Sequence, residues 1–121
     1  MAELLAGRVS DFDDDTRKIV SANGREIVVF RRKDRFYALD NTCLHMGGPV
    51  GEGIIIGKVE AILGEDKRFL GERFSEEEIH IVCPWHGWEY DIDTGACAGD
   101  GRLRLRRYET VERGDDVYVI I

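Results

Sequence analysis

Two short groups of cysteine and histidine are the residues of this chain best suited to chemistry. Cys43 and His45 form a Cys-x-His pair, and Cys83 and His86 form a Cys-x-x-His pair beyond residues 46–82. Two thiolates and two imidazoles can hold a [2Fe–2S] cluster, with both cysteines on one iron and both histidines on the other. They can also hold a zinc ion. The pattern therefore predicts a metal centre and leaves these two metals as alternatives.

Glycines follow both pairs, and their positions favour the iron–sulfur alternative. Gly47 and Gly48 come after the first pair, and Gly87 comes after the second. Because glycine has no Cβ, main-chain N–H groups there can approach bridging sulfides closely, and a zinc ion needs no such donors. With neutral histidines, two thiolates and two sulfides balance the charge of two ferric ions. An electron then adds to a neutral centre, which raises the potential.

These motifs resemble the two cluster loops of Rieske iron–sulfur proteins. Residues 43–49 resemble the first loop, residues 83–91 resemble the second, and residues 91–95 resemble the turn that follows it. The resemblance extends from about residue 4 to residue 121. It implies one Rieske-type [2Fe–2S] cluster bound by Cys43, His45, Cys83 and His86. It also implies supporting or docking roles for the residues around these ligands, which are Met46, Gly47, Gly48, Trp85, Gly87, Trp88 and Tyr90.

Departures from the family pattern point to a low-potential member. Respiratory Rieske proteins carry a loop disulfide at the positions of Gly48 and Trp85, and a serine hydroxyl at the position of Trp88. Tyr90 matches the family's tyrosine, so one hydroxyl is expected near a cysteine sulfur. The proline-rich third loop is missing, and residues 97–101 occupy that stretch. We therefore expect a potential towards the low end of the roughly −150 to +300 mV range of Rieske centres.

The ferredoxins of this family imply a function in electron transfer. They carry single electrons from an NAD(P)H-dependent flavoprotein reductase to a terminal oxygenase, so we expect two transient partners and a monomeric carrier. The electron would leave through His45 and His86. A terminal oxygenase also needs mononuclear iron on two histidines and a carboxylate, and His80 is the one histidine left over. We therefore expect this chain to be an electron-transfer protein and not an enzyme. The small subunit of a nitrite reductase is the alternative, and a zinc-binding structural module is less favoured.

Composition agrees with one small carrier domain. The chain has 121 residues, of which 43% are hydrophobic and 34% charged, and its net charge is −7. Residues 1–121 are expected to form a single domain, with the cluster-binding part at about 41–100. The negative charge argues against a nucleic-acid partner. The sequence has no apolar run long enough for a membrane span and no signal-peptide pattern at its start, so we expect a cytoplasmic protein.

The remaining sequence predicts an all-β fold, either an antiparallel sandwich or a small barrel. Turn signals at Asn23-Gly24, Lys33-Asp34 and Gly114-Asp115 separate short β-forming runs, which suggests eight to ten strands. Residues 102–106 alternate arginine with leucine, which predicts a strand whose arginines form one solvated face.

The connection at 51–78 and four single residues carry separate expectations. The connection is expected to be either an ornamented loop or a partner-selective element near the cluster. It can form a hairpin of 59–63 with 68–74, or a short helix capped by Ser75. We expect His80 to be a solvated strand residue and Cys97 to be a small buried hydrophobe. Trp85, like Met46, is expected to be partly exposed beside the cluster.

Overall fold

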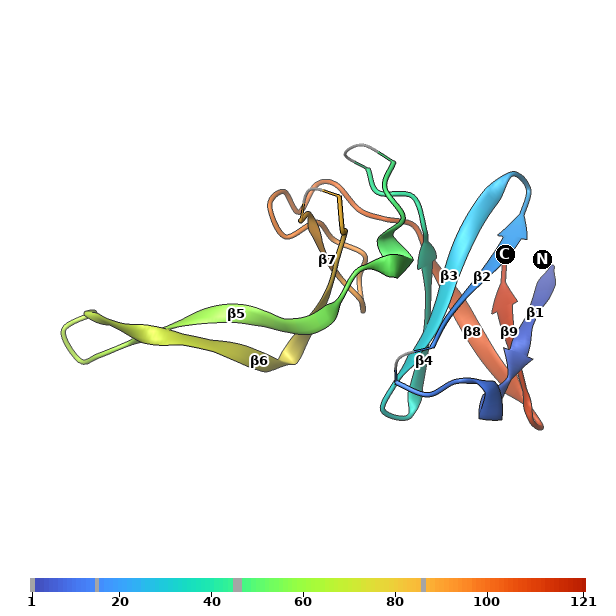
Figure 1. The fold of residues 1–121 in the computed structure, drawn as a ribbon, viewed down its shortest axis with the longest axis horizontal. Helices are drawn as coiled ribbons and strands as arrows, with labels where there is room; N and C mark the ends of the chain where they lie inside the picture. Colours follow the sequence, from blue (N-terminus) through green and yellow to red (C-terminus); the bar gives the residue numbers. More distant parts are fainter. Residues whose placement is uncertain (1, 15, 45–46, 86) are drawn as a thin grey trace.

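Antiparallel strands make up most of the molecule (Figure 1). The structure is a computed structural model that describes residues 2–14, 16–44, 47–85 and 87–121. Six strands form one sheet in the order β1-β9-β8-β4-β3-β2, and three form a second in the order β5-β6-β7. The predicted all-β fold is confirmed. In chain order the strands are β1 (Glu3–Arg8), β2 (Arg17–Ala22), β3 (Arg25–Arg32), β4 (Arg35–Asp40), β5 (Ile55–Leu63), β6 (Phe69–Val82), β7 (Glu89–Asp91), β8 (Arg107–Arg113) and β9 (Asp116–Ile120).

Tight turns build the six-stranded sheet from neighbouring strands. Asn23 and Gly24 join β2 to β3 with φ values of 52° and 76°, the left-handed conformation that two-residue hairpin turns require. Gly114, with φ 58°, joins β8 to β9. The chain ends close the sheet, because β1 pairs with β9 and also contacts β2. The result is a nearly closed barrel. Strand β1 was not predicted from the sequence, since its partner is the distant C-terminal strand.

Strand β3 is buried on both faces and separates two apolar cores. Ile27 and Val29 point into the barrel, where they join residues of β1, β8 and β9. Val28 and Phe30 point to the opposite side, where they join a core that contains all three cysteines. Because neighbouring residues of a strand face opposite sides, one strand supports both the barrel and the loops around the cysteines.

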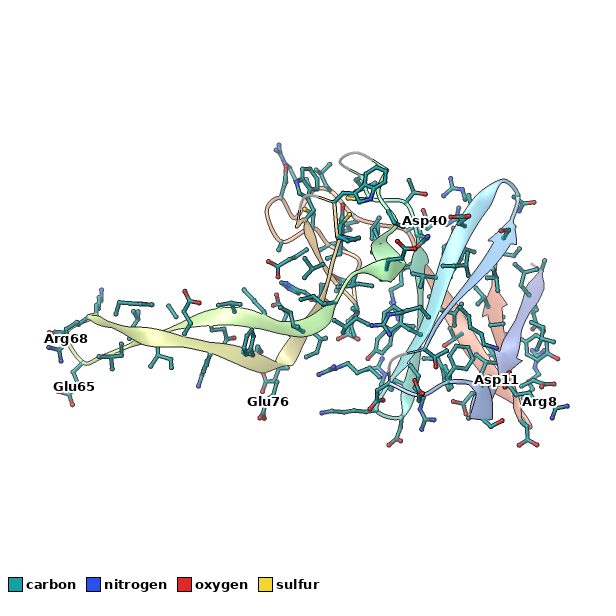
Figure 2. The ribbon with its side chains drawn as sticks, viewed as in Figure 1. Arg8, Asp11, Asp40, Glu65, Arg68 and Glu76 are labelled. Atoms are coloured by element: carbon teal, nitrogen blue, oxygen red, sulfur yellow. The ribbon has the colours of Figure 1, made fainter. Side chains whose placement is uncertain are left out.

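Strands β5 and β6 form a long arm that projects from the body of the molecule (Figure 1). This hairpin confirms one of the two structures predicted for residues 51–78. Figure 2 places Glu65 and Arg68 at its outer end and Glu76 near its bend. The alternative short helix at Ser75 is wrong, because these residues lie within β6. The Ser75 hydroxyl does accept the N–H groups of Glu77 and Glu78, at 3.2 and 3.0 Å. These bonds stabilise a bulge, where the register with β5 shifts, instead of a helix.

The outer half of the arm exposes large apolar side chains. Val59, Leu63, Phe69 and Phe74 are between 43% and 65% exposed. Val59 pairs with Phe74 and Leu63 pairs with Phe69, so cross-strand partners share a face of the hairpin. The arm therefore carries an apolar stripe.

The strand predicted for residues 102–106 is wrong. The β8 ladder begins at Arg107, and Arg104 makes only an isolated bridge to Ala96. Asp100 accepts the Arg102 N–H at 3.0 Å and binds its guanidinium, which holds a turn at this point. Leu105 is 2% exposed and Leu103 is 40% exposed, so the two leucines do not share a buried face. In the described part of the chain, no helix is long and apolar enough to cross a membrane.

Candidate metal centre

Cys43 and Cys83 lie just beyond the ends of two strands. Cys43 follows β4, and Cys83 follows β6 directly. Their exposed fractions are 4% and 2%, and both pack in the apolar core that joins the two sheets. The fold thus brings two thiols that are distant in sequence into one buried region.

A tight turn holds the first cysteine loop. The Gly47 N–H donates to the Cys43 carbonyl at 3.0 Å, and the Cys43 N–H donates to the Gly48 carbonyl at 2.9 Å. Gly47 has φ 75°, which a residue with a Cβ adopts only with strain. The glycine after the first Cys-x-His pair is therefore needed to close the loop.

The second loop repeats this hydrogen-bond pattern. The Gly87 N–H donates to the Cys83 carbonyl at 3.0 Å, and the Cys83 N–H donates to the Trp88 carbonyl at 2.8 Å. Gly87 also has φ 75°. In each loop the same main-chain geometry presents a cysteine at its start, so the two motifs are structural equivalents.

Asn41, which the sequence interpretation missed, anchors the base of the first loop. Asn41 is only 6% exposed, and its side-chain Oδ1 accepts the Gly51 N–H at 2.7 Å. Its carbonyl accepts the Val50 N–H at 2.8 Å. Because these bonds tie together the two stems of the loop, Asn41 fixes where the loop begins and ends. The only sequence signal was a polar residue between a β-strand and the first motif.

The two loops interlock at Gly48. A Cβ added there would lie 2.8 Å from the Trp85 ring and 3.0 Å from the Cys83 sulfur. Only glycine therefore permits this contact between the loops. Trp85 is 57% exposed, which confirms the partial exposure predicted from the sequence.

Tyr90 places a hydroxyl beside the first cysteine. Its hydroxyl oxygen lies 3.1 Å from the Cys43 sulfur and accepts the Leu44 N–H at 3.2 Å. Since that N–H already uses the oxygen as an acceptor, the hydroxyl proton is available to the sulfur. Burial, followed by the hydrogen bond to Cys43, raises the pKa of Tyr90 above its ordinary value. The hydroxyl therefore remains protonated as a donor.

The segment at 97–101 lies against the second loop. Cys97 is 6% exposed, which confirms that it is buried. The Ala98 N–H donates to the Glu89 carbonyl at 2.9 Å. The segment lines a hollow of about 480 Å³ together with Gly87, Trp88, Glu89 and Leu103.

His80 is not the solvated residue that its strand alternation predicted. It is 2% exposed, and its Nδ1 and Nε2 lie 3.0 and 2.6 Å from carboxylate oxygens of Glu89 and Glu78. The expectation failed because strand alternation assigns a face but does not show what covers it.

The described residues fit the predicted centre. The structure brings together Cys43, Cys83 and the supporting residues Gly47, Gly48, Trp85, Gly87, Trp88 and Tyr90. His45, Met46 and His86 lie outside the described residues. Two buried cysteines on equivalent loops, one with a hydroxyl donor, are suited to a cluster whose sulfurs need hydrogen bonds.

Comparison with known protein families gives a match over most of the chain. A family model for the Rieske [2Fe-2S] domain matches residues 2–109. This domain implies one Rieske-type cluster with cysteine and histidine ligands.

Curated relatives include isolated carriers and parts of larger proteins. A human Rieske domain-containing protein is 30% identical over 94 residues, which are 78% of this chain and 49% of the relative. The oxygenase component of a probable 3-ketosteroid-9-alpha-monooxygenase from Rhodococcus rhodochrous is 32% identical over 76% of this chain and 18% of its own length. The chain thus spans half or less of these two relatives. Ferredoxin CarAc from Metapseudomonas resinovorans is 27% identical over 91% of this chain and 85% of its own length.

Solved structures with the same fold come from two redox systems. The ferredoxin of carbazole 1,9a-dioxygenase from Nocardioides aromaticivorans is 22% identical with a TM-score of 0.70, over 98% of this chain and 97% of its own. A protein described as an NADH-dependent nitrite reductase small subunit from Mycobacterium tuberculosis is 16% identical with a TM-score of 0.76, over 98% and 93%. At these identities the similarity establishes the fold alone.

Proposed function

The chain belongs to the Rieske [2Fe–2S] family, and we propose that it passes single electrons from an NAD(P)H-dependent flavoprotein reductase to a terminal oxygenase. The observation that carries the proposal is the match to ferredoxin CarAc, which extends over most of both chains. The oxygenase component matches only through a small part of its length. The proposed carrier is a cytoplasmic monomer without catalytic activity of its own.

The proposed ligands are Cys43 and Cys83 on one iron, and His45 and His86 on the other. When bound, the cluster accepts and releases one electron. The supporting evidence is the shared hydrogen-bond pattern of the two loops, which presents both cysteines from equivalent positions. Tyr90 donates to the Cys43 sulfur, and the left-handed glycines shape the loops. These residues orient the ligands and keep water from the sulfurs.

The proposed contact surface for both redox partners is the apolar loop tips. Trp85 is 57% exposed directly beside the proposed ligand His86. Met46 is likewise next to a proposed ligand in the sequence, since it follows His45 in the first loop. Transient electron-transfer partners use small contact areas, so a few exposed apolar side chains next to the exit route are sufficient. Solved structures of carbazole 1,9a-dioxygenase contain its oxygenase in complex with its ferredoxin, a carrier of the same fold.

A nitrite reductase system is the second candidate. The specific observation in its favour is that two structures described as nitrite reductase small subunits share the fold at TM-scores of 0.74 and 0.76. Their sequence identities of 14% and 16% are lower than the 27% of ferredoxin CarAc. We therefore favour the oxygenase system.

Metal analysis of ligand variants tests the cluster. The purified protein should contain two irons and two acid-labile sulfides per chain and show a Rieske-type electron paramagnetic resonance signal after one-electron reduction. Cys43→Ser, His45→Ala, Cys83→Ser and His86→Ala should each lose or disable the cluster, because each iron has only two protein ligands. Cys97→Ser is the matched control and should keep both irons. One zinc per chain after anaerobic purification from iron-replete cells would contradict the proposal.

Reconstitution distinguishes the two redox systems. An NADH-dependent flavoprotein reductase and a terminal oxygenase from the same source should form hydroxylated product only when the carrier is added. A nitrite reductase subunit would instead remain bound to its large subunit during purification and restore nitrite reduction. The second result would replace the oxygenase assignment.

A further inference from the structure

Three carboxylates and one imidazole gather on the outer face of β6 and β7. Glu78 and His80 are two residues apart on β6, and Glu89 and Asp91 are two residues apart on β7. His80 lies directly opposite Asp91 in the strand pairing. Since residues two apart share a face of a strand, all four side chains stand on one side of this sheet. The other side carries Ile79, Ile81 and Tyr90, which belong to the apolar core.

The imidazole is buried at the centre of this group. His80 is 2% exposed, whereas Glu78 and Glu89 keep 40% and 36% of their side chains exposed. Ligand atoms of Glu78, His80 and Asp91 all lie within 4.8 Å of one another. Asp91 is also oriented by its own turn, where its Oδ1 accepts the Asp93 N–H at 2.7 Å. A buried imidazole is therefore surrounded by carboxylates, of which that of Asp91 is oriented by the backbone.

Hydrogen bonding by a neutral imidazole cannot satisfy this arrangement. A neutral ring has one N–H, and an ionised carboxylate only accepts. Yet Nε2 is 2.6 Å from Glu78 Oε2, and Nδ1 is 3.0 Å from Glu89 Oε1. The two contacts of this nine-tenths-buried ring are therefore satisfied in one of two ways: by a proton on each ring nitrogen, or by a metal ion that takes the place of one of these protons. Lys58 also approaches Glu78 Oε2, but its ammonium is 3.7 Å away and its side chain is half-exposed.

We propose that Glu78, His80 and Asp91 bind one divalent transition-metal ion of the zinc class, separate from the iron–sulfur site. The metal would take Nε2 of His80 and one oxygen from each of the two carboxylates, with water as a fourth ligand. Zinc accepts this combination of nitrogen and oxygen ligands. The imidazole selects such an ion over Mg²⁺ or Ca²⁺, which are bound by oxygen.

Glu89 has the role of a positioning residue in this site. Metal-binding histidines almost always donate their second ring N–H to a carboxylate or carbonyl, which fixes the tautomer and the ring orientation. The contact of His80 Nδ1 with Glu89 at 3.0 Å has this geometry. It leaves Nε2, which faces Glu78, as the metal-binding atom.

Zinc binding by the iron-loaded protein tests the proposal. The iron content of the protein is measured before and after zinc is added. If zinc replaces iron at the cysteines, both the iron content and the visible absorbance decrease. At micromolar free zinc, measured by competition with a chromophoric chelator, the wild type should bind one zinc per chain and keep its iron.

Four variants assign the ligands. His80→Gln and Glu78→Gln should weaken zinc binding by about 100-fold or more, because each removes one of three protein ligands. Glu89→Gln should weaken it by about 10–100-fold, as expected for an outer hydrogen-bond partner. Glu76→Gln is the control, since Glu76 is an exposed glutamate of the same strand outside the group. It should bind zinc like the wild type. Glu78→Gln changes a partly exposed side chain, so it keeps the test decisive if His80→Gln does not fold.

Three results would overturn the proposal. The first is a wild type that keeps its iron and binds no zinc at micromolar concentrations. The second is equal zinc binding by the wild type, His80→Gln and Glu78→Gln. The third is a nitrogen-15 NMR spectrum in which both His80 nitrogens remain protonated with zinc present, which would show that a proton alone occupies the place between the imidazole and the carboxylates.

Discussion

The hydroxyl of Tyr90 should raise the reduction potential of the centre, and Tyr90→Phe should lower it. The hydroxyl lies 3.1 Å from the Cys43 sulfur, and the Leu44 N–H directs its proton towards that sulfur. A reduced cluster carries one more negative charge, so its sulfurs accept hydrogen bonds more strongly than those of the oxidised cluster. The bond therefore stabilises the reduced state more, and its loss shifts the equilibrium towards oxidation.

The size of the shift follows from the strength of one hydrogen bond. A protein hydrogen bond contributes about 0.5–1.5 kcal/mol net. For a one-electron couple, about 1.4 kcal/mol corresponds to roughly 59 mV. If most of the bond's energy is gained on reduction, Tyr90→Phe should lower the midpoint by about 20–60 mV. The loss of the phenol oxygen also leaves the Leu44 N–H without this acceptor, so iron content must be measured alongside.

Voltammetry of matched variants measures this effect. Tyr108→Phe is the control, because Tyr108 is also buried and its hydroxyl donates to Asp40 at 2.7 Å in the other core. It should leave the midpoint unchanged. An unchanged or higher midpoint in Tyr90→Phe, with two irons retained, would refute the assignment of the hydroxyl as a donor to the sulfur. An equal decrease in both variants would show a general effect of tyrosine removal.

Four further predictions concern loop contact, stability, pH and docking. Gly48→Ala should lower the iron content, because its Cβ would lie 2.8 Å from the Trp85 indole and 3.0 Å from the Cys83 sulfur of the second loop. Gly99→Ala is the control, because a Cβ there meets open space, and it should keep the iron content of the wild type. Asn41→Ala should reduce the free energy of unfolding by about 1–3 kcal/mol in denaturant titrations, since it leaves a buried N–H unpaired; no loss would contradict its anchoring role. Because burial raises the pKa of Tyr90 in the folded state, its stability contribution should be complete below pH 10.0, the unfolded value, and should decrease as pH rises above it. Chemical unfolding at pH 9 and pH 11 checks this sign, and greater stability at the higher pH would refute it. Met46→Glu should slow electron transfer to the reductase and the acceptor in stopped-flow kinetics without changing the visible spectrum, and a kinetically silent Met46→Glu would move the docking surface elsewhere.

Local chemistry made much of this protein predictable from its sequence. Left-handed turn residues such as Asn23-Gly24 end strands wherever they occur, so the hairpins could be placed without a structure. The two Cys–His motifs are also local, because each ligand pair and its closing glycine lie within a few residues of one another. The all-β fold and the two metal-binding motifs were therefore expected from short segments, whereas the tyrosine hydroxyl beside a cysteine sulfur was expected only from the resemblance to Rieske proteins.

The remaining features depend on which distant segments meet. Strand β1 is a strand because β9 pairs with it, and Asn41 matters because the two stems of its loop lie side by side. Residues 102–106 have the alternation of a strand, but the turn held by Asp100 and the lack of a continuous partner keep them out of the sheet. His80 has the sequence context of an exposed residue and is buried, because β7 places Glu89 against its ring. Sequence periodicity assigns a side chain to a face, but burial and hydrogen-bond partners are set by the segment that covers that face, and only the tertiary structure decides which segment that is.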